Sequence, residues 1–209
     1  GKNVLIEKPL TLDLDQAEKL CKLSKDKSLT LMVGHLLLFH PAIIKIKDMI
    51  RNGAIGKLQY IYSNRLNLGQ VRANENVFWS LAPHDISIFQ FFTNLFPKEI
   101  NAQGSSFLQE GIYDSTITSL KYPNKIEGHI FVSWLHPFKE HRLVVIGSEG
   151  MLCFEDSQND KPLKHYSKKF DIGSGFPQKI DGPVEILGYN DAMPLKEELA
   201  YFINNLYSK

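Results

Sequence analysis

The sequence predicts an α+β fold: a large, mainly antiparallel open sheet flanked by helices, preceded by the last βαβ remnant of a doubly wound domain. Three observations predict it. Residues 1–34 read as strand, helix and strand, which is one βαβ unit. Residues 41–95 hold two helical segments around one long strand. A succession of short strands then precedes a final helix, and this grouping is typical of α+β domains.

The first βαβ unit has clear boundaries. Val4–Glu7 reads as a buried strand, which ends at Lys8 because the residue before a proline favours an extended backbone. Asp13 can cap the next helix, with Gln16 in the capping-box position. Leu29–Val33 is the second strand. Parallel βαβ units need cover on both faces and seldom stand alone, so we expect a remnant of a larger domain.

The middle of the chain alternates helix and strand. Pro41 suits the first turn of a helix that Gly53 ends. Lys57–Asn67 reads as a long strand. We expect a very apolar helix over Pro83–Leu95, with Pro83 near its first position.

The remainder is mostly strands. We expect them over Glu99–Phe107, Tyr113–Lys121, Lys125–Trp134, Arg142–Ile146 and Met151–Glu155, with a weaker one over Leu163–Lys169. Hairpin turns are expected at residues 122–124 and 147–150. Phe170–Pro183 is rich in Gly and Pro and reads as a loop, and a last helix is expected over Pro194–Tyr207.

The composition excludes several classes of partner. The 209-residue chain has ordinary hydrophobic and charged fractions of 43% and 22%. Its formal net charge is +1 and no Lys/Arg cluster stands out, so we expect neither nucleic acid nor a membrane as partner. No apolar run approaches the roughly 20 residues that cross a bilayer. Cys21 and Cys153 fit no metal spacing, and we interpret both as reduced core residues of a cytoplasmic protein.

Glu7-Lys8-Pro9 is the first candidate for chemistry. In open α/β sheets, ligands bind just beyond the carboxyl ends of the strands, where this tripeptide is expected. Desolvation there would lower the pKa of Lys8 toward a catalytically useful range. The competing interpretation is a surface lysine at a strand exit.

The second candidate is the start of the apolar helix. If Pro83 lies near the first position, His84 and Asp85 fall in the first turn, where the helix dipole disfavours an imidazolium. A neutral His84 can accept a proton or polarise a carbonyl. The alternative is a polar helix start in which Asp85 caps and His84 packs.

The third candidate is the segment Arg65–Asn76, which is dense in amide and guanidinium groups that suit hydroxyls, carboxylates and phosphates. The alternative is an exposed loop. Together with the helix start, it supplies the candidate substrate-binding residues, which are Arg65, Asn67, Arg72, Trp79, Ser80 and Asp85.

The order of these motifs resembles the glucose–fructose oxidoreductase / inositol dehydrogenase / rhizopine-catabolism (Gfo/Idh/MocA) family over essentially the whole chain. The matching elements are Glu7-Lys8-Pro9-Leu10, Val33-Gly34, Phe39-His40-Pro41, Gly53-Ala54-Ile55-Gly56 and Pro83-His84-Asp85.

The resemblance implies a domain division and an activity. Residues 1–34 would be the remnant of an amino-terminal Rossmann domain for NAD or NADP, and residues 35–209 a substrate-binding and oligomerisation domain. Members transfer a hydride between nicotinamide and a ring carbon of a sugar or related compound. By motif, Lys8 and His84 would be the catalytic residues. Glu7, Lys8 and Pro9 would lie near the nicotinamide. The open sheet would support a homo-oligomer.

Two departures from the family pattern matter. Many members carry Asp four residues before the histidine, where this chain has Ser80, so Asp85 or the cofactor ribose would take part in the proton relay instead. The surrounding residues 76–87 resemble the branch that acts on UDP-N-acetylglucosaminuronate and similar nucleotide sugars. In addition, no Gly-x-Gly-x-x-Gly follows a strand, so we expect an amino-terminally truncated chain without the main cofactor-binding site.

Two functions other than sugar oxidation and reduction are also considered. The chain would instead be a non-catalytic substrate-binding or oligomerisation module, inactive for lack of the glycine motif. A metal hydrolase is the other alternative, but the seven histidines fit no ligand spacing, and we expect no metal site.

Overall fold

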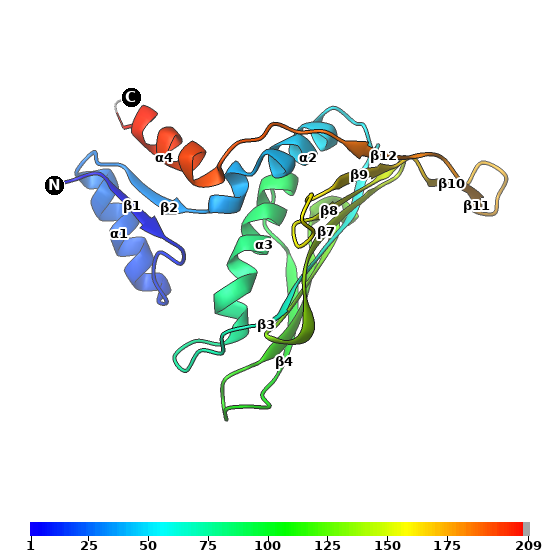
Figure 1. Ribbon diagram of the computed structural model, residues 1–209. Helices are drawn as coiled ribbons and strands as arrows, with labels where there is room; N and C mark the ends of the chain where they lie inside the picture. The colour runs from blue at the N-terminus through cyan, green and yellow to red at the C-terminus, as the bar shows by residue number, and fades with distance from the viewer. Residues whose placement is uncertain (207–209) are drawn as a thin grey trace.

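The computed structural model describes residues 1–206 and is dominated by one large sheet (Figure 1). Its strands are β3 (Leu58–Leu68), β4 (Glu99–Ser105), β5 (Ser115–Lys121), β6 (Glu127–Ser133), β7 (Leu135–Gly147), β8 (Met151–Glu155), β9 (Leu163–Tyr166) and β12 (Val184–Leu187). The eight strands run in the order β12-β9-β8-β7-β3-β6-β5-β4. Within this sheet β3 and β6 pair in parallel and all other described pairs are antiparallel, so the predicted large, mainly antiparallel sheet is confirmed.

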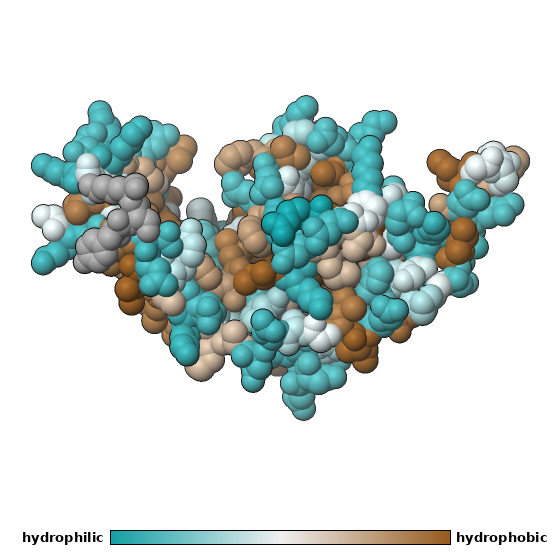
Figure 2. Space-filling view, turned by 90° about the horizontal axis from the view of Figure 1, so that it is seen from above, coloured by the Kyte–Doolittle hydropathy of each residue, from teal (hydrophilic) through white to brown (hydrophobic). Residues whose placement is uncertain are grey.

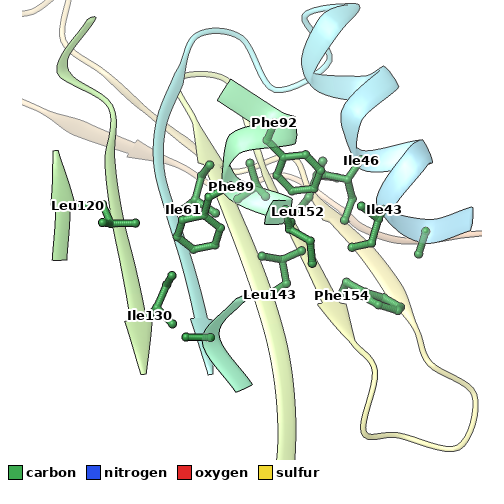
Figure 3. Packing of buried hydrophobic residues seen from close by; sticks show 14 of the residues in the cluster. Ile43, Ile46, Ile61, Phe89, Phe92, Leu120, Ile130, Leu143, Leu152 and Phe154 are labelled. Carbon is green, nitrogen blue, oxygen red and sulfur yellow. The ribbon is translucent and has the colours of Figure 1, made fainter. Parts of the chain in front are cut away.

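The core lies between one face of this sheet and two helices, α2 (Pro41–Arg51) and α3 (Val77–Thr93). Figure 3 shows Phe89 and Phe92 of α3 beside Ile43 and Ile46 of α2, above the sheet residues Ile61, Ile130 and Leu152. Gly128 of β6 leaves room for this packing, because a Cβ atom there would lie 3.0 Å from the Phe89 ring. Pro41 occupies the start of α2, as predicted.

A small parallel pair forms the amino-terminal unit. It consists of β1 (Val4–Glu7), α1 (Leu14–Asp26) and β2 (Leu31–Gly34), in which Glu7 lies opposite Gly34. The side chain of Asp13 accepts a hydrogen bond of 2.9 Å from the backbone N–H of Gln16, so the predicted cap of α1 is confirmed. The strands of this unit do not join the eight-stranded sheet.

The prediction for the start of α3 was wrong. The helix begins at Val77, where the side chain of Asn76 caps it by accepting a 3.1 Å hydrogen bond from the N–H of Trp79. Pro83 therefore lies inside the helix, which tolerates the missing N–H donor there. His84 and Asp85 consequently lie about two turns inside the helix, beyond the reach of the dipole effect of its first turn. Asp85 is not a cap.

The carboxyl-terminal third also differs from the prediction. The expected loop 170–183 contains most of a hairpin, β10 (Lys169–Asp171) and β11 (Gln178–Ile180), and β12 was not predicted. These strands have three or four residues, too few to show an alternating pattern. Figure 2 shows hydrophobic residues gathered on the projecting hairpin, where Phe170 and Phe176 are 60% and 81% exposed.

Shorter elements complete the fold. They are the 3₁₀ segments η1 (Leu36–Phe39) and η2 (Pro123–Lys125) and the helix α4 (Pro194–Asn204). The α4 helix lies against η1, where the rings of Phe39 and Tyr201 are 5.5 Å apart. Its predicted end at Tyr207 lies outside the described residues. None of the described helices has the length and apolar character needed to cross a membrane.

Candidate active site

Lys8 joins the amino-terminal unit to α3. It follows β1, and its Nζ donates a 2.9 Å hydrogen bond to the backbone carbonyl of Ser80, 72 residues further along the chain. Burial lowers the pKa of Lys8, while the charge of Glu75 opposes this shift and that of Arg72 adds to it. The lysine is therefore a partly desolvated ammonium aimed at the second turn of α3.

His84 is the most strongly perturbed histidine of this region. Burial lowers its pKa to about 3, and the nearby charges of Arg65, Lys8 and His35 contribute. Its buried Nδ1 has no hydrogen-bond partner among the described residues. His84 is thus neutral near pH 7, but the cause is desolvation and neighbouring cations rather than the end of a helix.

His35 is a member of this cluster that the sequence analysis did not single out. It directly follows β2, and Lys8 directly follows β1. Because β1 and β2 are parallel and end in register, the two residues leave the same edge of the sheet. Burial, and then the charge of Lys8, lowers the pKa of His35, and its buried Nδ1 also lacks a partner among the described residues. The parallel strand ends were the signal that could have found it.

Arg65 and Asp85 pair with each other beneath the histidine. Two 3.0 Å hydrogen bonds join the guanidinium to the carboxylate, and the side chains are only 11% and 2% exposed. Burial alone would lower the pKa of Arg65, but Asp85 raises it above its ordinary value. The pair ties α3 to β3 one residue after His84, so it fixes the turn that carries the imidazole.

The loop before α3 brings a carboxylate to the same place. The hydroxyl of Ser80 donates a 2.8 Å hydrogen bond to Oε1 of Glu75. The same oxygen lies 3.0 Å from Nε of Arg72. Glu75 was not among the predicted site residues, because a carboxylate in a polar loop carries no distinguishing pattern.

The remaining predicted residues are not joined to this centre by a side-chain hydrogen bond between described residues. Asn67 is half-buried near the end of β3, and Trp79 is 38% exposed in the first turn of α3. Glu7 is exposed and Pro9 half-buried on either side of Lys8. The described residues contain no group of three or more His, Cys, Asp or Glu side chains that could hold a metal ion.

The arrangement suits a ligand with hydroxyl groups. Two neutral imidazoles offer unpaired acceptor or donor nitrogens, and an ammonium beside them offers hydrogen-bond donors. Buried polar atoms of this kind normally have a partner, so unpaired ones at the meeting point of two strand ends and a helix indicate a place for a polar ligand.

Comparison with protein families gives two matches. The model described as the GFO/IDH/MocA C-terminal domain matches residues 43–153, which is more than half of the chain. The model described as an oxidoreductase family with an NAD-binding Rossmann fold matches residues 1–35.

Individual relatives agree with these matches. The chain is 31% identical over 105 residues to UDP-N-acetylglucosamine 3-dehydrogenase of Acidithiobacillus ferrooxidans, covering 50% of this chain and 32% of the relative. It is 25% identical over 218 residues to myo-inositol 2-dehydrogenase of Thermotoga maritima, covering 99% of this chain and 63% of the relative. The chain thus spans less than two thirds of the length of either relative.

Solved structures show the same fold. A structure of the A. ferrooxidans dehydrogenase superposes with a TM-score of 0.82 at 22% identity, over 99% of this chain and 63% of the other. An inositol dehydrogenase homologue from Azotobacter vinelandii, in complex with NADH and myo-inositol, superposes with a TM-score of 0.75 at 18% identity, over 96% and 58%.

Proposed function

The chain belongs to the Gfo/Idh/MocA family of oxidoreductases, and from this membership we propose that it is the substrate-binding part of a nicotinamide-dependent sugar dehydrogenase. The reaction is hydride transfer between the nicotinamide and a ring carbon of a sugar or nucleotide sugar. One observation carries the proposal: Lys8 from the edge of β1 and His84 from α3 meet beside Ser80, although they lie far apart in the sequence.

The cofactor would be NAD or NADP. The carboxyl edge of β1 and β2 fits its nicotinamide end, because a desolvated ammonium and two unpaired imidazole nitrogens meet there. Glu7, Lys8 and Pro9 are the residues of this chain that would lie against it. When bound, a nicotinamide accepts or donates the hydride, and the protein contributes position and electrostatics.

His84 and Lys8 would handle the proton. As the hydride leaves the carbinol carbon, the hydroxyl proton passes to the neutral imidazole of His84, while the Lys8 ammonium donates a hydrogen bond to the same oxygen. In the reverse direction the imidazolium returns the proton. A well-placed acid or base of this kind contributes roughly 10²–10⁴-fold in rate.

A sugar or nucleotide sugar is the substrate class that fits best. His35 and His84 have unpaired nitrogens that several adjacent hydroxyls can use. The half-exposed guanidinium of Arg72 in the neighbouring loop suits a phosphate or carboxylate on the same ligand. The names of the relatives, a UDP-N-acetylglucosamine dehydrogenase and an inositol dehydrogenase, belong to this class.

Replacing His84 tests the proposal. The protein made from its complete reading frame is assayed for NAD⁺ and NADP⁺ reduction with UDP-N-acetylglucosamine and myo-inositol. His84→Asn is expected to lower turnover by roughly 10²–10⁴-fold, because the proton acceptor is lost. His165→Asn is the matched control, since His165 lies on β9, in register with Leu152 and Glu185. Unchanged turnover in His84→Asn removes this residue from the mechanism.

A non-catalytic module is the second candidate. It is favoured by Ser80, which lies where many family members carry Asp. Titration of NADH into the protein made from its complete reading frame separates the two, because only the dehydrogenase is expected to bind it. A lack of micromolar binding would favour the non-catalytic module.

The open sheet face is a proposed self-association surface. All described helices lie on the other side (Figure 1). By strand register, Tyr62 and Val144 lie on this open face with Phe131 close by. A Val144→Lys variant is expected to lower the molar mass measured by light scattering, and an unchanged mass contradicts the proposal. We also propose a cytoplasmic location, because Cys21 and Cys153 are both free thiols. Cys153 is buried as predicted, but Cys21 is exposed, so its prediction as a core residue was wrong.

A further inference from the structure

The ammonium of Lys8 is partly desolvated and lies near two guanidinium groups. Burial lowers its pKa, and Arg72 and Arg65 lower it further. A lysine that must donate a hydrogen bond to a substrate oxygen near pH 7 therefore needs a counter-charge. Ser80, whose backbone carbonyl accepts the hydrogen bond from Lys8, carries no charge.

Glu75 is the carboxylate that best fits the requirement for a counter-charge. Of the charges that favour the protonated lysine, that of Glu75 has the largest effect and that of Glu7 is smaller. Glu75 is also attached to the turn that Lys8 contacts, because the Ser80 hydroxyl donates to its Oε1 at 2.8 Å. Glu7, by contrast, is exposed.

The hydrogen bond of Glu75 is not needed to start the helix. The cap of α3 is already supplied by Asn76, which accepts from the N–H of Trp79 at 3.1 Å. The Glu75 side chain is 24% exposed, so it reaches the cluster from the loop without being part of the hydrophobic core. Its position is therefore explained by the Ser80 hydroxyl and the Arg72 guanidinium, which both contact Oε1, rather than by the packing of α3.

We propose that Glu75, held by Ser80, is a positioning residue that keeps Lys8 protonated and directed at the substrate oxygen. This inference rests on the proposed dehydrogenase function and deepens it. The charge that balances the catalytic lysine comes from the loop ahead of the helix rather than from the helical turn itself. Both carboxylate oxygens of Asp85 are bonded to Arg65, whereas the contacts of Glu75 with Arg72 and Ser80 both use Oε1.

The titration of Lys8 tests the inference on the chain itself, without substrate or cofactor. The lysine 13Cε resonances are followed against pH in the wild type and in Glu75→Gln, Arg72→Gln and Glu99→Gln. The pKa of Lys8 is expected to fall in Glu75→Gln and to rise in Arg72→Gln, because the two groups act with opposite sign. Glu99→Gln removes an exposed acid that pairs with Lys121 elsewhere and is expected to leave Lys8 unchanged.

A rescue variant separates this role from a purely structural one. Adding Ser80→Asp to Glu75→Gln restores a carboxylate on the turn that Lys8 contacts, so the pKa of Lys8 is expected to recover. In the protein from the complete reading frame, Glu75→Gln moves the alkaline limb of kcat/KM to lower pH, and the double variant moves it back. The limb moves down because a lysine with a lower pKa loses its proton sooner as the pH rises.

The outcomes are distinguishable from those of the histidine test. A Lys8 pKa that is the same in Glu75→Gln and the wild type overturns the inference, even if His84→Asn is inactive. A shifted Lys8 pKa alongside an active His84→Asn supports the Glu75–Lys8 coupling and contradicts the proposed function instead. If Glu75→Gln does not fold, Ser80→Ala decides the matter, because it removes the hydroxyl that holds Glu75: the pKa of Lys8 is expected to fall, and an unchanged pKa overturns the inference.

Discussion

The two halves of the candidate site come from regions that are packed very differently. Helix α1 of the amino-terminal unit buries none of its residues, and Leu14 and Leu23 are 73% and 53% exposed. Helix α3 buries seven, including Phe89. Lys8 is thus carried by a region with little core of its own, and His84 by the described helix that buries the most residues. The site therefore depends on how one region docks on the other.

The largest expected difference between the regions is in core deletion. Phe89→Ala removes a fully buried ring between α3 and the sheet, and we expect it to lower the free energy of unfolding by about 3–5 kcal/mol. Leu23→Ala in α1 should change it by less than about 0.5 kcal/mol. Urea unfolding followed by circular dichroism measures both. Equal losses would mean that α1 is as tightly packed as α3.

The buried ion pair under His84 is the next most sensitive feature. Asp85→Asn leaves Arg65 buried without its counter-charge, and we expect a loss of about 3 kcal/mol in the free energy of unfolding. The double variant Arg65→Met/Asp85→Leu should lose much less, because no unpaired charge remains. A double variant as unstable as Asp85→Asn would show that packing, and not charge, holds α3 to β3.

Acid should act most strongly where α3 packs on the large sheet, through His84 of α3 and His141 of β7. The pKa values of His84 and His141 are lowered to about 3 and about 4. The unfolded chain therefore binds protons more readily than the folded one, and stability is lost as pH falls below about 6.5. Each such histidine contributes a slope of roughly 1.4 kcal/mol per pH unit. Urea unfolding at several pH values should show a shallower slope in His84→Asn, and an identical slope contradicts the assignment.

The smallest expected effect concerns the cap of α1. Asp13→Ala removes the side-chain acceptor for the N–H of Gln16 and should cost about 1 kcal/mol. Because α1 packs loosely, we expect faster hydrogen exchange confined to α1 and unchanged exchange in α3. Exchange that rises equally in both helices would show that the two regions unfold as one unit.

Local signals in the sequence were sufficient for part of this structure. The cap at Asp13 and the start of α2 at Pro41 depend on neighbouring residues, and both were predicted. Pro83 misled the prediction because a proline suits either a first turn or a tolerated interior position, and only tertiary packing decides between them. The short strands β10–β12 carry too few residues for a pattern.

The residues of the candidate site divide in the same way, into those that a sequence motif indicates and those that it does not. Lys8 and His84 were proposed as catalytic residues because their motifs are distinctive in order and spacing. His35 was not singled out because it comes near Lys8 only through the pairing of two strands, and Glu75 was not because a carboxylate in a polar loop carries no distinguishing pattern. The parallel pairing of β3 with β6 is long-range in the same sense.

The hydrogen bond from Lys8 to the Ser80 carbonyl links the docking of the amino-terminal unit to the geometry of the candidate site. A shift of β1 relative to α3 would move the Lys8 ammonium away from the helix that carries His84. Variants that loosen this junction are therefore expected to lose activity while their thermal unfolding curves stay unchanged. The position of Lys8 depends directly on whether the two parts of the polypeptide are docked together.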